Sequence, residues 1–283
     1  MDISSFIHPE DKVALDQLKS IPFAGNLIKK IMGLFDEQIA YGLNMAQKIR
    51  LSEKQLPHLY RLLPPIADKL GIPEPEFYLE MDTHPNAYAM GETRTAITIT
   101  SGLLQLMTED EVRAVIGHEC GHILCHHMLY TTMVNYIMRY SPGIPEISQS
   151  AVVALLYWNR KSELSCDRVA AYVTSPEIAT SMLARLAGGP PELTYDFNLE
   201  EYAKQANEYE SIRTEDLWNK TLQAWMTLTL DHPFNSVRTR ELLKWTRSEQ
   251  YVNLMSDIPM CPRCHNAIEP EWSFCKFCGK SLQ

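Results

Sequence analysis

Apolar residues recur at the three- and four-residue spacing of amphipathic helices over most of the chain. Between residues 11 and 70 prolines interrupt this spacing, which predicts several short scaffold helices. Two stretches differ, FYLEMD at 77–82 and AITIT at 96–100, because both are short, rich in β-forming residues and bounded by turn residues. We therefore expect an α+β fold that is mainly helical, with a small sheet.

The strongest helix signal begins at Thr108, which forms a capping-box pattern with Glu111. Apolar positions continue at helical spacing, and His126 and His127 are expected to extend this helix toward a polar break at 141–150. Further helices are expected over 151–173, from Pro176 to the GGPP sequence at 188–191, and up to about residue 252.

Composition favours one sizeable globular domain with a small appendage, since 283 residues are 45% hydrophobic and 22% charged. The net charge of −9 argues against nucleic acid or an anionic membrane as partner. Charges within the first twenty residues exclude a secretion signal there, and no window approaches the roughly 18 apolar residues of a spanning helix. We expect a soluble, cytoplasmic protein without an integral membrane segment.

The stretch GHECGH carries candidate metal chemistry, because His118 and His122 lie one turn apart on one face of the expected helix. Glu119 is displaced around the helix, where it can contact a metal-bound water instead of the metal. This pattern is typical of a catalytic zinc site with glutamate as general base. Such a site normally takes a third protein ligand.

The helix KSELSCDRVAAY offers that third ligand. Glu163 and Asp167 are four residues apart, on one face of a helix expected to lie antiparallel to the first. Glu163 can bind zinc, while Asp167 can accept the second ring N–H of a ligating histidine. Alternatively, Glu163 forms only solvated pairs with Arg160 and Arg168; the first motif favours the metal interpretation.

Three blocks then carry a family resemblance: GHECGHILCHH, ELSCDRVA some forty residues later, and DHPFNSVRTREL near the end of the domain. They resemble the HtpX-like zinc peptidases, gluzincins that also include the Ste-type CAAX prenyl proteases. NAYAMGETRTAITITSGLL is similar to the family's edge strand and the strand and helix that follow it. The resemblance covers about residues 70–243. It implies a zincin-like catalytic domain that hydrolyses peptide or unfolded protein substrates.

Matched residue by residue, the resemblance implies that the zinc ligands are His118, His122 and Glu163. It also implies that Glu119 is the general base and that Asp167 orients a ligating histidine. It also assigns active-site roles to His232 and Arg238. His232 would donate a hydrogen bond to the developing oxyanion, and Arg238 would hold His232 or Asp167. The alternatives are a surface histidine before a proline and an ordinary helix-surface arginine.

The resemblance also places Asn86 and Ala87 on a strand whose free backbone groups can pair with an extended peptide substrate. Two features depart from the family. Cys166 stands where many relatives carry Ala, and as a soft donor three residues from Glu163 it could compete for the metal. HtpX-type relatives have membrane-spanning helices and none is visible here, which favours the family's soluble members and puts a membrane-protein substrate in doubt.

The C-terminal tail contains two C-x-x-C pairs separated by ten residues, formed by Cys261, Cys264, Cys275 and Cys278. Four thiolates suit tetrahedral coordination, and so short a segment has almost no core of its own. We predict a structural zinc ribbon, with iron in a rubredoxin-like site as the alternative. Nearby aromatic residues either contact a protein partner or simply cover the metal site: Trp272, Phe274 and Phe277.

The expected domains are an N-terminal helical segment at 1–70, a zinc metallopeptidase domain at 71–254 and the ribbon at 255–283. Within the first, the amphipathic stretch at 21–35 is expected to pack as a scaffold helix rather than lie on a membrane. The chain should bind two zinc ions, one catalytic and one structural. The alternative function is a catalytically silent, metal-stabilised scaffold that acts through protein binding by the ribbon.

Overall fold

The structure is a computed structural model that describes residues 2–20, 37–140, 149–215, 234–256, 261–263, 268, 272–276 and 278–282. The stretch at 21–35 therefore lies outside the described residues. The chain divides into two compact units, Met1–Leu242 and Leu243–Gln283. Among the described helices, none combines the length and apolar character that crossing a membrane requires.

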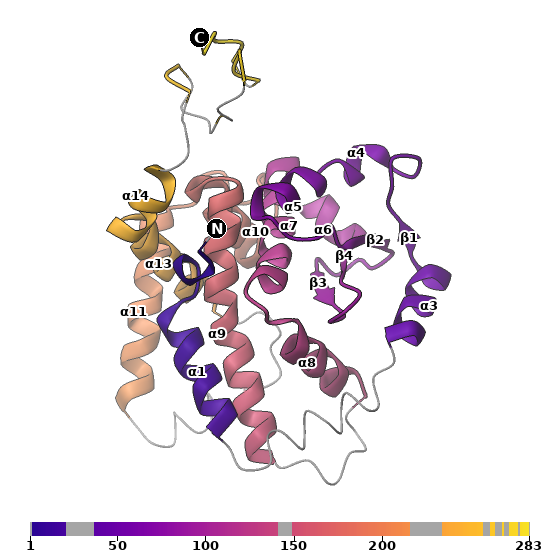
Figure 1. Ribbon diagram of the computed structural model, residues 1–283. Helices are drawn as coiled ribbons and strands as arrows, with labels where there is room; N and C mark the ends of the chain where they lie inside the picture. Colours follow the sequence, from indigo (N-terminus) through magenta and orange to yellow (C-terminus); the bar gives the residue numbers. More distant parts are fainter. Residues whose placement is uncertain are drawn as a thin grey trace. The chain divides into compact units, whose positions relative to one another are not determined.

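The first unit is mainly helical with one small sheet, as predicted (Figure 1). A short 3-10 helix at Ile3–Ser5 precedes α1. The helices are α1 (Pro9–Ser20), α3 (Glu37–Gln47), α4 (Pro57–Tyr60), α5 (Pro64–Leu70), α6 (Ser101–Leu106), α7 (Glu109–Leu124), α8 (Met128–Tyr140), α9 (Gln149–Val173), α10 (Pro176–Gly188) and α11 (Leu199–Glu215). Helix α13 (Asn235–Thr246) crosses into the second unit, which also contains α14 (Glu249–Ser256).

The sheet has four strands in the order β1-β2-β4-β3. Its strands are β1 (Ile49–Arg50), β2 (Glu76–Glu80), β3 (Ala87–Met90) and β4 (Ala96–Thr100). Strands β2 and β4 run parallel, and the outer strands β1 and β3 pair antiparallel with them. Strand β4 is buried along its whole length, which suits its unbroken run of β-forming residues. The prediction placed β4 correctly and β2 one to two residues too late.

The helix that carries GHECGH ends earlier than predicted. Its start is as expected, because the Thr108 side chain accepts from the Glu111 N–H and the Glu111 carboxylate accepts from the Thr108 N–H. However, α7 stops at Leu124, and His126 adopts a left-handed conformation with φ 58° before α8 begins. This turn directs the His127 ring between the rings of His122 and Trp158. The extension through His126 and His127 was therefore wrong.

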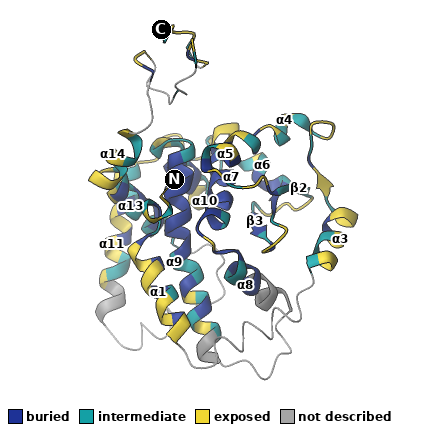
Figure 2. Cartoon of the chain, viewed as in Figure 1, coloured by how far each residue is buried: buried dark blue, intermediate teal, exposed yellow. Residues whose placement is uncertain are grey.

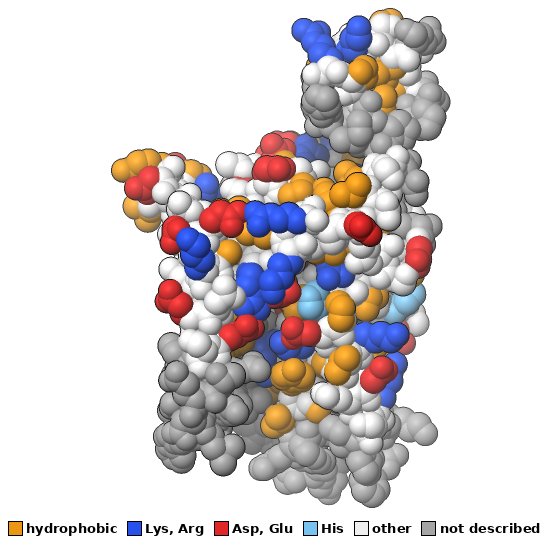
Figure 3. All heavy atoms as spheres, turned by 90° about the vertical axis from the view of Figure 1, so that its left-hand side faces the viewer, with side chains coloured by type: hydrophobic (Ala, Val, Ile, Leu, Met, Phe, Trp, Pro, Cys, Tyr) orange, Lys and Arg blue, Asp and Glu red, His pale blue; other side chains and the backbone are white. Residues whose placement is uncertain are grey.

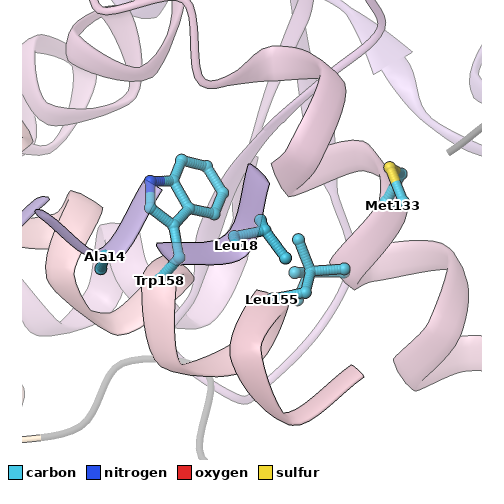
Figure 4. Packing of buried hydrophobic residues seen from close by; sticks show 6 residues of the cluster. Ala14, Leu18, Met133, Leu155 and Trp158 are labelled. Atoms are coloured by element: carbon cyan, nitrogen blue, oxygen red, sulfur yellow. The ribbon is translucent and has the colours of Figure 1, made fainter. Parts of the chain in front are cut away.

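Helix α9 lies at the centre of the first unit, with α1 alongside it (Figure 1). The C-terminal half of α9, residues 162–172, is buried, whereas one side of α1 is exposed (Figure 2). Ala14 and Leu18 of α1 pack in one apolar cluster with Leu155 and Trp158 of α9 and Met133 of α8 (Figure 4). Burial of apolar surface contributes about 25 cal/mol of folding free energy per Å², and this contribution holds α1 and α8 against α9.

Charged side chains of both signs are interspersed on the face of the molecule shown in Figure 3. In the first unit, Arg240 of α13 pairs with Glu210 of α11 at 2.7 Å and with its neighbour Glu241 at 2.7 Å. The face in Figure 3 therefore presents interspersed positive and negative side chains instead of a surface of one charge sign.

Two glycines let α7 approach α9 closely. A Cβ on Gly117 would lie 2.3 Å from Cγ2 of Val173, and a Cβ on Gly121 would lie 3.0 Å from Cα of Cys166. Because the atom opposite Gly121 belongs to the backbone, a side chain there can be accommodated only if one helix moves. The glycines of GHECGH thus set the helix spacing on which the side chains between the helices depend.

We expect Gly121→Ala to destabilise the protein despite the better helix propensity of alanine. The gain of about 1 kcal/mol from propensity is outweighed by an overpacking cost of about 1–3 kcal/mol where the helices cross. Gly42→Ala in α3 is the matched control, because no atom lies within 4 Å of its added Cβ. It should stabilise by up to about 1 kcal/mol. Urea unfolding of both variants measures the difference; equal stabilisation would show that the helices tolerate the methyl group.

Candidate metal centre

Three predicted ligands from two helices meet in the interior of the first unit. The Nε2 atom of His118 on α7 lies 3.2 Å from Oε2 of Glu163 on α9, and Nε2 of His122 lies 3.3 Å from Oε1 of the same carboxylate. All three residues are buried, with Glu163 only 2% exposed. Glu163 therefore does not belong to a solvated row of helix ion pairs.

The separations between these donor atoms fit a single zinc ion. Zinc bonds to histidine nitrogen and carboxylate oxygen are about 2.0–2.2 Å long, so a tetrahedral arrangement places neighbouring donors about 3.3–3.5 Å apart. The two nitrogen–oxygen distances of 3.2 and 3.3 Å lie close to that spacing. Two imidazoles and one carboxylate also form a donor set that zinc accepts. The residues present thus fit the metal.

Asp167 contacts His118 at Nδ1, the ring nitrogen that does not face Glu163, and Arg238 in turn binds Asp167. Asp167 Oδ1 lies 3.1 Å from Nδ1 of His118. Arg238 of α13 binds the same carboxylate with two hydrogen bonds, Nε to Oδ2 at 2.8 Å and Nη2 to Oδ1 at 2.6 Å. Its Nη1 atom also lies 3.5 Å from Oε2 of Glu163. Arg238 is 2% exposed, so it is not an ordinary surface arginine. Of its two predicted partners, His232 and Asp167, it contacts Asp167.

The charges around His118 favour a cation between the helices. Burial lowers the pKa of His118, but the charges and hydrogen bonds of Glu163 and Asp167 outweigh burial and raise this pKa to about 10. Burial raises the pKa of Asp167, yet the charge and hydrogen bonds of Arg238 hold it below its usual value. The ionised carboxylate of Asp167 therefore favours a proton or a metal ion on the imidazole of His118.

Glu119 follows His118 on α7 and is 3% exposed. A carboxylate is rarely buried to this extent without a structural or chemical reason. On the sheet, Ala87 begins β3, and Asn86 immediately precedes it. Strand β3 pairs only with β4 in the described part of the chain, so it forms one edge of the sheet. His232 lies outside the described residues, and its role stays a prediction.

The sequence did not reveal that Asp11 is a buried carboxylate next to His127. Asp11 of α1 accepts hydrogen bonds from Trp158 Nε1 at 2.9 Å and Ser165 Oγ at 2.6 Å, and it lies 3.1 Å from Nε2 of His127. Asp11 is 1% exposed although it lies in a charged N-terminal stretch. Nothing in the hydropathy pattern distinguishes it from the exposed charges beside it. These bonds connect α1 to α9 at the level of the histidines.

In the second unit, three of the four predicted ribbon cysteines lie together. The sulfur atoms of Cys261, Cys275 and Cys278 are all within 4.8 Å of one another, and Cys261 and Cys278 are 3.6 Å apart. Gly279 adopts φ 69° and donates its N–H to the Cys275 carbonyl, which closes a tight turn around the second pair. Cys264 lies outside the described residues. The cluster could form the predicted zinc ribbon.

Two histidines and a carboxylate buried between two packed helices are an arrangement typical of the metallopeptidase class. The chain belongs to peptidase family M48, whose model matches residues 53–246. The plastoglobule-localized metallopeptidase 48, chloroplastic, of Arabidopsis thaliana is 32% identical over 263 residues, which cover 90% of this chain and 76% of that protein. The predicted membership is confirmed.

HtpX proteases are also similar to this chain over a shorter region. The Protease HtpX homolog of Sulfurihydrogenibium sp. is 34% identical over 101 residues, which cover 35% of this chain and 33% of that protein. Among solved structures, the crystal structure of S. mikatae Ste24p shares 16% identity and a TM-score of 0.38, covering 85% of this chain and 62% of that one. The TM-score is too low to compare the two folds.

Proposed function

We propose that this chain is a zinc-dependent endopeptidase in which His118, His122 and Glu163 hold zinc and Glu119 is the general base. The observation that carries the proposal is the convergence of both Nε2 atoms on one carboxylate, at 3.2 and 3.3 Å. Membership of a metallopeptidase family supports peptide or protein substrates. The cytoplasmic location remains a prediction.

Zinc, when bound, acts as a Lewis acid on the scissile carbonyl and lowers the pKa of water. Glu119 accepts a proton from the attacking water and delivers it to the leaving amine. Asp167 accepts the Nδ1–H of His118, which fixes the tautomer that leaves Nε2 as a ligand. Arg238 fixes the orientation of Asp167 through its paired hydrogen bonds.

Substrate binding is proposed at the edge of the sheet. An extended peptide would pair with the outer edge of β3 near Asn86 and Ala87, which supplies affinity through backbone hydrogen bonds with little sequence preference. His232 would donate a hydrogen bond to the developing oxyanion. Removing such a donor typically costs about 3 kcal/mol of transition-state stabilisation.

The tail is proposed to bind a second, structural zinc through Cys261, Cys264, Cys275 and Cys278. A site closed by four thiolates has no open position for substrate, so it stabilises the tail without hydrolysing peptides. A protein partner at this segment stays a proposal, and Phe274 there is 62% exposed. Iron would fit the same four thiolates, and elemental analysis distinguishes the two metals.

Metal analysis and chelation test the two sites together. We expect about two zinc ions per chain, and a chelator should remove the ion of the open catalytic site first, abolishing cleavage of an unfolded test protein. Glu163→Gln should lose the same ion, whereas Cys275→Ser should lose the other. Mass spectrometry under native conditions counts the ions. Full cleavage by protein that has lost the histidine-bound zinc would contradict the proposal.

A further inference from the structure

A cysteine lies beside the histidine pair. Cys166 follows Glu163 by three residues on α9, about one turn further along, and it is 0% exposed. Its sulfur, one nitrogen of His118 and one nitrogen of His122 all lie within 4.8 Å of one another. The opposing helix carries Gly121, whose missing side chain leaves the backbone of Cys166 in close contact with α7.

The distances rank Glu163 and Cys166 as metal donors. Zinc bonds of about 2.1 Å to nitrogen and 2.3 Å to sulfur place these donors about 3.6 Å apart in a tetrahedron. The oxygens of Glu163 already have the spacing required for a shared ion. The sulfur of Cys166 lies within 4.8 Å of a nitrogen of each histidine, so small movements of side chains can bring it to the spacing of about 3.6 Å. Glu163 is therefore the resident ligand, and Cys166 is within reach.

The thiol also has an acceptor for its proton. Its sulfur lies 3.7 Å from Nδ1 of His127, whose Nε2 lies 3.1 Å from Oδ2 of Asp11. The carboxylate requires a donor at Nε2, so Nδ1 of the neutral ring is the atom that accepts from the thiol. On His122, Nδ1 is buried and has no hydrogen-bond partner among the described residues.

We propose that Cys166 is an additional ligand of the cation held by His118 and His122, recruited when that cation is soft, as cadmium is. The inference rests on the proposed metal centre and concerns which metals it selects. On binding, the S–H bond breaks, a sulfur–metal bond forms, and the proton passes to Nδ1 of His127. No electron is transferred. Thiolate sulfur suits soft metals better than carboxylate oxygen, so cadmium should gain more from Cys166 than zinc does.

Cadmium NMR of the full chain tests the proposal, because the resonance position reports sulfur coordination directly. We expect two cadmium signals, one from the cysteine-rich tail and one from the histidine site. Cys166→Ala should move only the second signal, away from the region of sulfur coordination. It should also lower the cadmium affinity of that site, relative to its zinc affinity, by at least about tenfold in competition titrations.

Cys120→Ala is the matched control, since Cys120 is equally buried on α7 but is not in the donor cluster. It should leave both signals in place, and Cys166→Ser provides a second variant if alanine lowers the folded yield. An unmoved histidine-site signal in both Cys166 variants, together with a signal that moves in Glu163→Gln, overturns the role of Cys166 alone. The absence of any cadmium signal from the histidine site in the parent protein overturns the metal centre as well.

Discussion

Glu119→Gln is expected to lower kcat for hydrolysis of an unfolded test protein by about 10²- to 10⁴-fold, the usual contribution of general acid–base catalysis. Glutamine has nearly the same shape as glutamate but cannot accept a proton from the attacking water. The variant should still bind about two zinc ions, because Glu119 is not among the three proposed ligands. Cleavage rates at saturating substrate and zinc content of the same sample measure the two effects separately.

Glu109→Gln is the matched control on the same helix. Its carboxylate lies in the first turn of α7, where it pairs with Arg113 on the surface. This change should leave the cleavage rate unaltered. Equal activity of Glu119→Gln and the parent would exclude the proton-transfer role. A parent protein that binds zinc but cleaves nothing would favour the scaffold alternative, in which the ribbon acts by binding a partner.

The positions of the proposed metal donors were predictable because the face that a helical residue occupies depends on spacing alone. Residues four apart share a face in any α-helix, so the positions of His118 and His122, and of Glu163 and Asp167, followed from the sequence once both helices were recognised. The role of Arg238 could not be decided this way. The role depends on where α13 lies, and the resemblance left both His232 and Asp167 open as partners of Arg238.

Features that depend on contacts between distant segments could not be predicted from the pattern. The helix ends before His126 although the apolar spacing continues, because His127 turns inward toward Asp11, more than a hundred residues away in sequence. The two-residue strand β1 is too short to show a periodicity and exists through its pairing with β2. Gly121 appears unremarkable in a helix until Cys166 is placed against it. Each case is a tertiary contact that overrides local preference.

Arg238→Met is expected to destabilise the protein by about 3–5 kcal/mol, because it leaves the buried carboxylate of Asp167 without its cationic partner. Asp167 is 1% exposed, so water cannot replace the two lost hydrogen bonds. Such a loss is a large fraction of a typical unfolding free energy of about 5–15 kcal/mol. Urea unfolding of the zinc-loaded protein measures it. Arg113→Met, which breaks only surface pairs with Glu109 and Asp110, should cost at most about 1 kcal/mol.

The double variant Asp167→Leu, Arg238→Met separates stability from metal binding. Removing both charges abolishes the unpaired carboxylate, so much of the lost unfolding free energy should return. Zinc affinity should nevertheless stay about 10- to 100-fold below that of the parent, because His118 has lost the acceptor that orients its ring. Competition with a zinc-binding dye measures this affinity. Parent-like zinc affinity in the double variant would show that Asp167 and Arg238 stabilise the helices without orienting the ligand.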